Sequence, residues 1–318
     1  MKILYLDPVV GTENAIKYPY YNGLISGFTG NKNVEIGLYS GLPNDIDELL
    51  STSNFEPDFI LFGLGWFGHF RYFKKIKNHK NIPIVVLLFK PQNDLKEKLK
   101  FCVENNVSLI LTPAPILKQI ENKTGINVKL FEYGCYTTIF DQPQQKKYDI
   151  GFSGAMHAAD LYPEGEFKNK NIRFKIKDIL ERKTNINTYW KGNDSFEESR
   201  IHNYNDYAKK VNSCKIWLAT LASHGDVTPR YYEIMSSNTL LFCEEPHELY
   251  KDILIDGENC VTFKSDLSDF ESKLEYYLNN EKERKKIIEN GIKFSKQNTD
   301  WAHKSKKLLD ILTGLNGQ

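Results

Sequence analysis

An arginine and a glutamate stand three residues apart in the segment Thr228–Glu233, whose residue types could do chemistry on a phosphorylated ligand. Thr228 suits the N-cap of a helix, where its hydroxyl is expected to accept from backbone N–H groups, and Pro229 suits the first helical position. Residues three apart share a helical face, so Arg230 and Glu233 would lie together near a helix start. There they could bind a diphosphate and a ribose diol. The alternative is a surface helix with one ion pair.

A serine and a glycine near the end of another predicted strand offer a second place for a phosphate. The strand begins at Tyr148 and reaches Ser153 and Gly154. Because glycine has no side chain, backbone N–H groups around Gly154 could approach phosphate oxygens. The alternative is an ordinary turn glycine.

The bulk properties exclude several classes of function. The 318 residues carry 42 basic and 41 acidic side chains, for a net charge of +1, so we expect no nucleic acid and no anionic membrane as a partner. Hydrophobic residues form 41% of the chain, enough for two domain cores. The five cysteines are far apart and include no Cys-x-x-Cys pair, which favours reduced thiols in the cytoplasm. The apolar run before Asp7 is too short for a signal peptide or a membrane span.

Short apolar runs alternate with helical patterns, which predicts parallel sheets wound by helices. The predicted strands are Lys2–Leu6, Val34–Tyr39, Asp58–Phe62, Ile84–Phe89, Ser108–Leu111, Val128–Phe131, the run from Tyr148, Asn185–Tyr189, Lys215–Ala219 and Thr239–Cys243. The predicted helices include Asn93–Glu104, Phe174–Arg182, Tyr204–Asn212, Asp266–Leu278, Glu281–Lys296 and Trp301–Leu312. Paired lysines such as Lys146-Lys147 are expected on solvated faces.

The segment Ser223–Glu248 resembles the donor-binding region of GT-B glycosyltransferases. It is most similar to the group with a spore-maturation-type C-terminal domain, related to glycosyltransferase family 4. The shared pattern is a small-residue turn, Thr-x-Arg-x-x-Glu, a strand and an acidic segment. In this chain the corresponding parts are Thr228–Glu233, Leu240–Phe242, Glu245–Leu249, Asp256–Asn259 and the terminal Thr299–Lys304. The resemblance covers roughly Tyr148 to Leu312, and the first half matches only in architecture.

The resemblance implies roles for individual residues. Glu233 would hold the ribose, and Arg230 would neutralise the departing diphosphate in place of a metal. The implied donor-binding residues are Ser153, Gly154, His202, Tyr204, Thr228, Arg230 and Glu233. His202 and Tyr204 would line the base pocket, where uracil and guanine both remain open.

The chain departs from the family at Gly225, where relatives commonly carry a first glutamate near the donor sugar. His224 and Asp226 flank this glycine and could reach the sugar or the diphosphate. Together with Arg230 they are the catalytic candidates. If no acid is supplied here, the chain could instead be a non-catalytic nucleotide-sugar-binding protein.

The segment Gly63–Gly68 formally fits the Gly-x-Gly-x-x-Gly dinucleotide fingerprint and raises an NAD-dependent oxidoreductase as a further alternative. It follows the third predicted strand rather than the first, and Trp66 and Phe67 would crowd a pyrophosphate. We therefore expect a cleft loop with Gly65, Trp66 and His69 near an acceptor or a sugar. A packed aromatic loop without ligand contact is the other interpretation.

No metal site is predicted. Asp45-Ile46-Asp47 resembles the Asp-x-Asp that holds Mn²⁺ in the other large glycosyltransferase fold, but it opens a predicted helix, where acids favour the helix dipole.

The sequence thus predicts an α/β protein of the GT-B class, with two Rossmann-like domains whose parallel sheets face a central cleft. Residues 1–134 would form the acceptor domain, 135–147 a linker and 148–300 the nucleotide-sugar-binding domain. The helix and tail at 301–318 could pack back on the first domain. The expected activity is a metal-independent, retaining transfer of a UDP- or GDP-linked sugar to a glycan or another acceptor hydroxyl. No cofactor is expected beyond this donor substrate.

Overall fold

The computed structural model describes residues 1–7, 23–28, 31–39, 45–63, 75–91, 94–156, 172–193, 198, 201, 203–222 and 224–315. The chain divides into two compact units. The first comprises Met1–Glu132 with Ser305–Gln318, and the second comprises Tyr133–Lys304.

The first unit is built on a six-stranded sheet with the order β2-β1-β3-β4-β5-β6, in which every neighbouring pair is parallel. Its central strands are buried along their whole length, as expected where both faces of a sheet are covered. The strands are β1 (Lys2–Leu6), β2 (Glu35–Tyr39), β3 (Phe59–Gly63), β4 (Ile84–Leu87), β5 (Leu109–Thr112) and β6 (Val128–Leu130). The helices are α2 (Gly23–Phe28), α3 (Ile46–Ser53), α4 (Leu95–Glu104) and α5 (Leu117–Thr124), joined by the last part of α12 (Trp301–Leu315).

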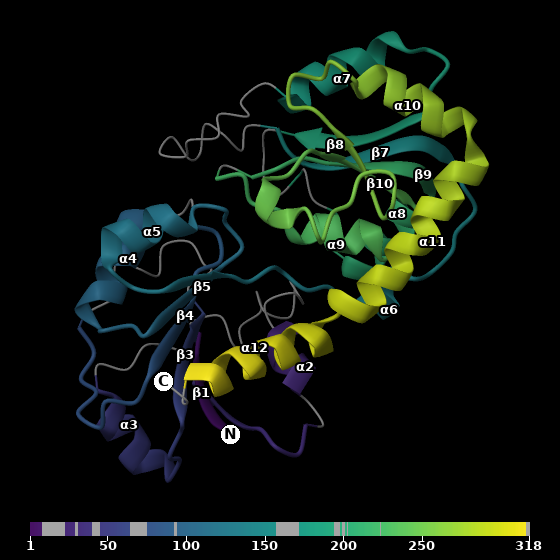
Figure 1. Cartoon of the computed structure of the whole chain (residues 1–318). Helices are drawn as coiled ribbons and strands as arrows, with labels where there is room; N and C mark the ends of the chain where they lie inside the picture. The colour runs from purple at the N-terminus through teal and green to yellow at the C-terminus, as the bar shows by residue number, and fades with distance from the viewer. Residues whose placement is uncertain are drawn as a thin grey trace. The chain divides into compact units, whose positions relative to one another are not determined.

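The second unit contains a five-stranded parallel sheet with the order β11-β10-β9-β7-β8. Figure 1 shows α7 and α10 on one side of this sheet and α8 and α9 on the other. The strands are β7 (Tyr148–Ala155), β8 (Thr188–Asn193), β9 (Cys214–Ala219), β10 (Leu240–Glu244) and β11 (Val261–Phe263). The helices are α6 (Thr137–Phe140), α7 (Ile172–Arg182), α8 (Tyr204–Asn212), α9 (Pro229–Met235), α10 (Phe270–Asn279) and α11 (Glu281–Asn298), with a 3₁₀ turn η3 at Glu248–Tyr250.

The predicted strands are all present, but β8 begins three residues later than expected. The backbone N–H of Ile186 donates to the carbonyl of Lys183 at 3.2 Å, so the chain is still turning there. Strand β11 was not predicted. It is only three residues long, which is too short for a clear alternation of apolar and polar positions.

The segment 135–147, expected as a linker, lies within the second unit and contains α6. Cys135 and Phe140 are fully buried there. Lys146 is not on a solvated face as expected, because its ammonium group donates to the carbonyls of Asn212 and Cys214 at 2.9 and 2.8 Å, and also to that of Asn238. A lysine can leave the surface when backbone acceptors replace water around its charge. Across the described ranges, no helix combines the length and apolar character needed to cross a membrane.

Candidate active site

Helix α9 begins where the Thr-Pro pair predicts it, but its cap differs from the prediction. Thr228 occupies the N-cap position with an extended backbone, yet its side chain accepts no hydrogen bond from a backbone N–H group of the helix. Among the described residues its buried hydroxyl oxygen has no hydrogen-bond partner. The helix has seven residues, so its dipole alone is a weak reason to bind a phosphate. The argument for an anion site therefore depends on the side chains around it.

Arg230 lies against Gly154 at the carboxyl end of β7. A Cβ atom on Gly154 would stand 3.2 Å from Nη2 of Arg230, and the residue has a φ of +153°. The Arg230 guanidinium also stands over the ring of Phe152, 5.8 Å from its centroid, and within the described ranges its buried Nε has no hydrogen-bond partner. Gly154 and Arg230 were each predicted to bind a diphosphate, and the fold brings them together although they are 76 positions apart in the chain.

A second arginine, which sequence reasoning missed, converges on the same ring. Arg173 lies in the first turn of α7, with its guanidinium carbon 5.7 Å from the Phe152 centroid. Its Nε donates to the hydroxyl of Thr220 at 2.8 Å, and another guanidinium nitrogen donates to the carbonyl of Ala155. These bonds fix the side chain beside the carboxyl end of β7, where parallel α/β sheets bind their ligands.

The two guanidinium groups repel each other. Burial and the neighbouring charge of Arg230 together lower the pKa of Arg173 to about 10, while the carboxylate of Glu244 opposes both effects. Glu244 is fully buried and also accepts from the N–H of Leu221 at 3.0 Å and from Ser265 at 2.8 Å. Two cations held together around one aromatic ring form a site that an anion would stabilise.

Glu233 is only 6% exposed, so it does not lie on the exposed surface of a helix, as the alternative to a ligand role supposed. Its Oε1 accepts from the hydroxyl of Tyr204 at 2.7 Å. Tyr207 lies one helical turn further along α8. Burial and the charge of Glu233 raise its pKa, and the charge of Arg230 partly offsets this increase. Arg230 and Glu233 are neighbours because they are three residues apart on α9.

The turn at Gly225 has a physical reason for its glycine. The residue has a φ of +74°, a conformation that favours glycine, and its N–H donates to the carbonyl of Ala222 at 2.9 Å. A glutamate at this position would be strained. The flanking candidates His224 and Asp226 are buried, with exposures of 5% and 2%. Their proposed contact with a sugar remains a prediction.

Several candidates lie outside the described residues, namely His202, Gly65, Trp66 and His69. Gly63, the first glycine of the Gly-x-Gly-x-x-Gly segment, is among the residues that the structure describes. A Cβ atom on Gly63 would stand 2.1 Å from Oδ2 of Asp7 and 2.7 Å from the hydroxyl of Tyr5. Close packing against the end of β1 therefore explains this glycine without a pyrophosphate.

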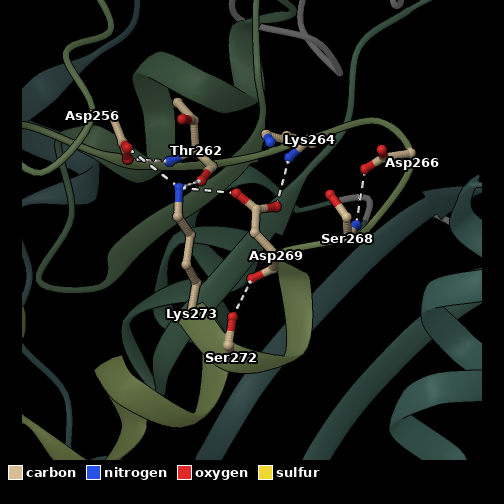
Figure 2. Close-up of polar contacts among 8 residues, drawn as sticks. All are labelled: Asp256, Thr262, Lys264, Asp266, Ser268, Asp269, Ser272 and Lys273. Carbon is tan, nitrogen blue, oxygen red and sulfur yellow. Dashed lines mark hydrogen bonds and ion pairs between the residues drawn. The ribbon is translucent and has the colours of Figure 1, made fainter.

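The acidic segment before α10 has a structural role. Lys273 donates to the carbonyl of Thr262 at 2.7 Å and pairs with Asp256 and Asp269 at 3.3 and 3.2 Å (Figure 2). Asp256 also accepts from the N–H of Thr262, and Asp269 from that of Lys264. This network closes the connection between β11 and α10, so the part of the family resemblance around Asp256 reflects folding.

Asp45 and Asp47 behave as the helix-start interpretation predicts. Asp45 caps α3 by accepting from the N–H of Glu48 at 3.1 Å, and Asp47 accepts from the N–H of His79 at 2.8 Å. Within the described part of the chain, no three metal-binding side chains come together.

Comparison with solved structures identifies the fold class. Similar chains include HepE of Anabaena in complex with UDP and glucose (12% identity, TM-score 0.52, covering 99% of this chain and 100% of that one). Sucrose-phosphate synthase from Thermosynechococcus elongatus matches at 8% identity with a TM-score of 0.57, covering both chains fully. A glycosyltransferase from Rickettsia africae matches at 12% identity with a TM-score of 0.54, covering 98% of each chain. The fold is therefore GT-B, as the sequence predicts.

The second unit carries the more specific match. Residues 170–310 match the model of the family described as glycosyl transferase-like. This confirms the resemblance to GT-B glycosyltransferases, and it covers the segment that contains Arg173, Arg230 and Glu233. No curated protein matches the sequence significantly.

Proposed function

We propose that this protein is a glycosyltransferase that takes a sugar from a nucleotide-diphosphate donor bound by the second unit and transfers it to a glycan or another acceptor hydroxyl. The convergence of Arg173 and Arg230 on Phe152 beside Gly154 supports this proposal most directly. The match of residues 170–310 to the glycosyl transferase-like family supports the same activity. UDP is the first nucleotide to test, because the similar HepE structures were determined with UDP and with UDP-glucose.

In this mechanism the two arginines hold the diphosphate and neutralise the charge that grows on it as the glycosidic bond breaks. A fixed guanidinium then stabilises the transition state more than the bound donor. Glu233 accepts from the ribose hydroxyls and orients the nucleotide. We propose that no metal takes part and that the anomeric configuration is retained, in line with the resemblance to family 4.

The kinetics of Arg230→Ala test the proposal. We expect kcat to fall more than the donor KM rises, with partial recovery in Arg230→Lys, because lysine lacks the two-pronged geometry that grips two oxygens. The assay is UDP release from UDP-glucose and related donors, with and without simple acceptor sugars. Arg182→Ala, which removes an exposed charge from α7, is the matched control. If Arg230→Ala keeps the wild-type kcat, Arg230 does not stabilise the departing diphosphate.

A nucleotide-sugar-binding protein without transferase activity is the second candidate. Gly225 favours it, because its positive φ would strain the glutamate that relatives commonly carry. Tight UDP-sugar binding with no turnover across a panel of donors and acceptors would support this candidate.

A further inference from the structure

The hydroxyl of Tyr204 and the carboxylate of Glu233 form a contact that the family resemblance does not supply. Tyr204 was expected to line the base pocket, but it donates to Oε1 of Glu233 at 2.7 Å. The two residues come from different helices, α8 and α9, and stand 29 positions apart. A hydrogen bond to a charged acceptor is among the stronger polar contacts in proteins and holds the carboxylate in one rotamer.

The ring of Tyr204 is itself held in place by packing. It makes edge contacts with Phe140 of α6 at 5.2 Å between centroids and with Tyr136 at 6.5 Å. Burial raises the pKa of Tyr204 well above its ordinary value, and the nearby Glu233 raises it further, so the hydroxyl keeps its proton and remains a donor. The side chain is therefore both fixed and correctly protonated for one task.

We propose that Tyr204 is a positioning residue that orients the Glu233 carboxylate for the ribose diol of the donor. This inference rests on the proposed function, and it assigns Tyr204 to ribose recognition instead of base recognition. A carboxylate oxygen can accept more than one hydrogen bond, so Oε1 can bind the tyrosine and a ribose hydroxyl together. The tyrosine thus acts on the nucleotide only through Glu233.

The test compares UDP with 2′-deoxy-UDP by calorimetry. In Tyr204→Phe we expect UDP affinity to fall by severalfold to about tenfold, because the Glu233 carboxylate would then have to be ordered when the ribose binds, and 2′-deoxy-UDP affinity to fall less. The preference for UDP over 2′-deoxy-UDP should therefore shrink severalfold. Tyr231→Phe is the matched control: its hydroxyl is also buried and donates to the carbonyl of Glu244 at 3.3 Å, away from Glu233. It should keep the wild-type preference.

A double-mutant cycle separates positioning from a general packing effect. If Tyr204 acts through Glu233, Tyr204→Phe should change UDP affinity less than twofold when Glu233→Gln is already present. Equal losses in both backgrounds, or an unchanged preference for UDP in a folded Tyr204→Phe, would overturn the positioning role while leaving the transferase proposal intact. If the wild-type protein binds neither UDP nor GDP, the proposed function fails and this inference fails with it.

Discussion

Replacing Arg173 with methionine separates ligand binding from stability. The two guanidinium carbons lie 5.7 and 5.8 Å from the same ring centroid, so they are at most about 12 Å apart. At an effective dielectric constant of about 20 their repulsion is then at least about 1.4 kcal/mol. Arg173→Met removes this repulsion but also loses the bonds to Thr220 and Ala155. Because the two effects oppose each other, the free energy of unfolding without ligand should change by less than about 2 kcal/mol.

Nucleotide binding should respond far more strongly. A lost hydrogen bond to a charged group costs about 1.5–3 kcal/mol, which corresponds to a loss in UDP affinity of about tenfold to 100-fold. Uridine, which has no phosphate, should lose less than twofold. Calorimetry with both ligands measures the difference, and thermal unfolding shows whether the variant is folded. Arg182→Met gives the same change in net charge from an exposed position on α7. If a folded Arg173→Met binds UDP as tightly as the wild type does, Arg173 does not contact the diphosphate.

Three further outcomes are expected. Gly154→Ala should weaken UDP binding, because its methyl group would stand 3.2 Å from a guanidinium nitrogen of Arg230 and displace that group. Gly257→Ala, with a φ of +73° but open space around it, should lower the thermal midpoint and leave UDP affinity unchanged. Burial lowers the pKa of Lys146 to about 8, so the folded state loses this proton before the unfolded state does. Denaturant titrations from pH 7 to 9.5 should therefore show wild-type stability rising relative to Lys146→Met by about 2 kcal/mol, and parallel curves would contradict this. EDTA should leave sugar transfer intact. The double variant with Asp45→Asn and Asp47→Asn should bind UDP with wild-type affinity. A strict requirement of the transfer reaction for Mn²⁺ would refute the metal-free proposal.

The chain's local patterns predicted most of its secondary structure and the class of its fold. Apolar runs of strand length, alternating with helical periodicity, are sufficient for parallel α/β units, since both strand faces are buried. The Thr-Pro pair at 228–229 placed the start of α9, and the acids at 45 and 47 placed the start of α3. These signals depend only on neighbours in the chain.

Contacts between distant segments could not be predicted in this way. Arg173 and Arg182 are arginines of one helix, yet only Arg173 reaches Phe152, because β7 and α7 pack together in three dimensions. Lys146 belongs to a charged pair, but it donates to three carbonyl groups from two distant segments, at 212–214 and at Asn238. The sequence by itself determined the elements and the family resemblance. Only the tertiary structure decided which side chains meet at the carboxyl end of β7, because burial and electrostatic partners depend on how the elements pack.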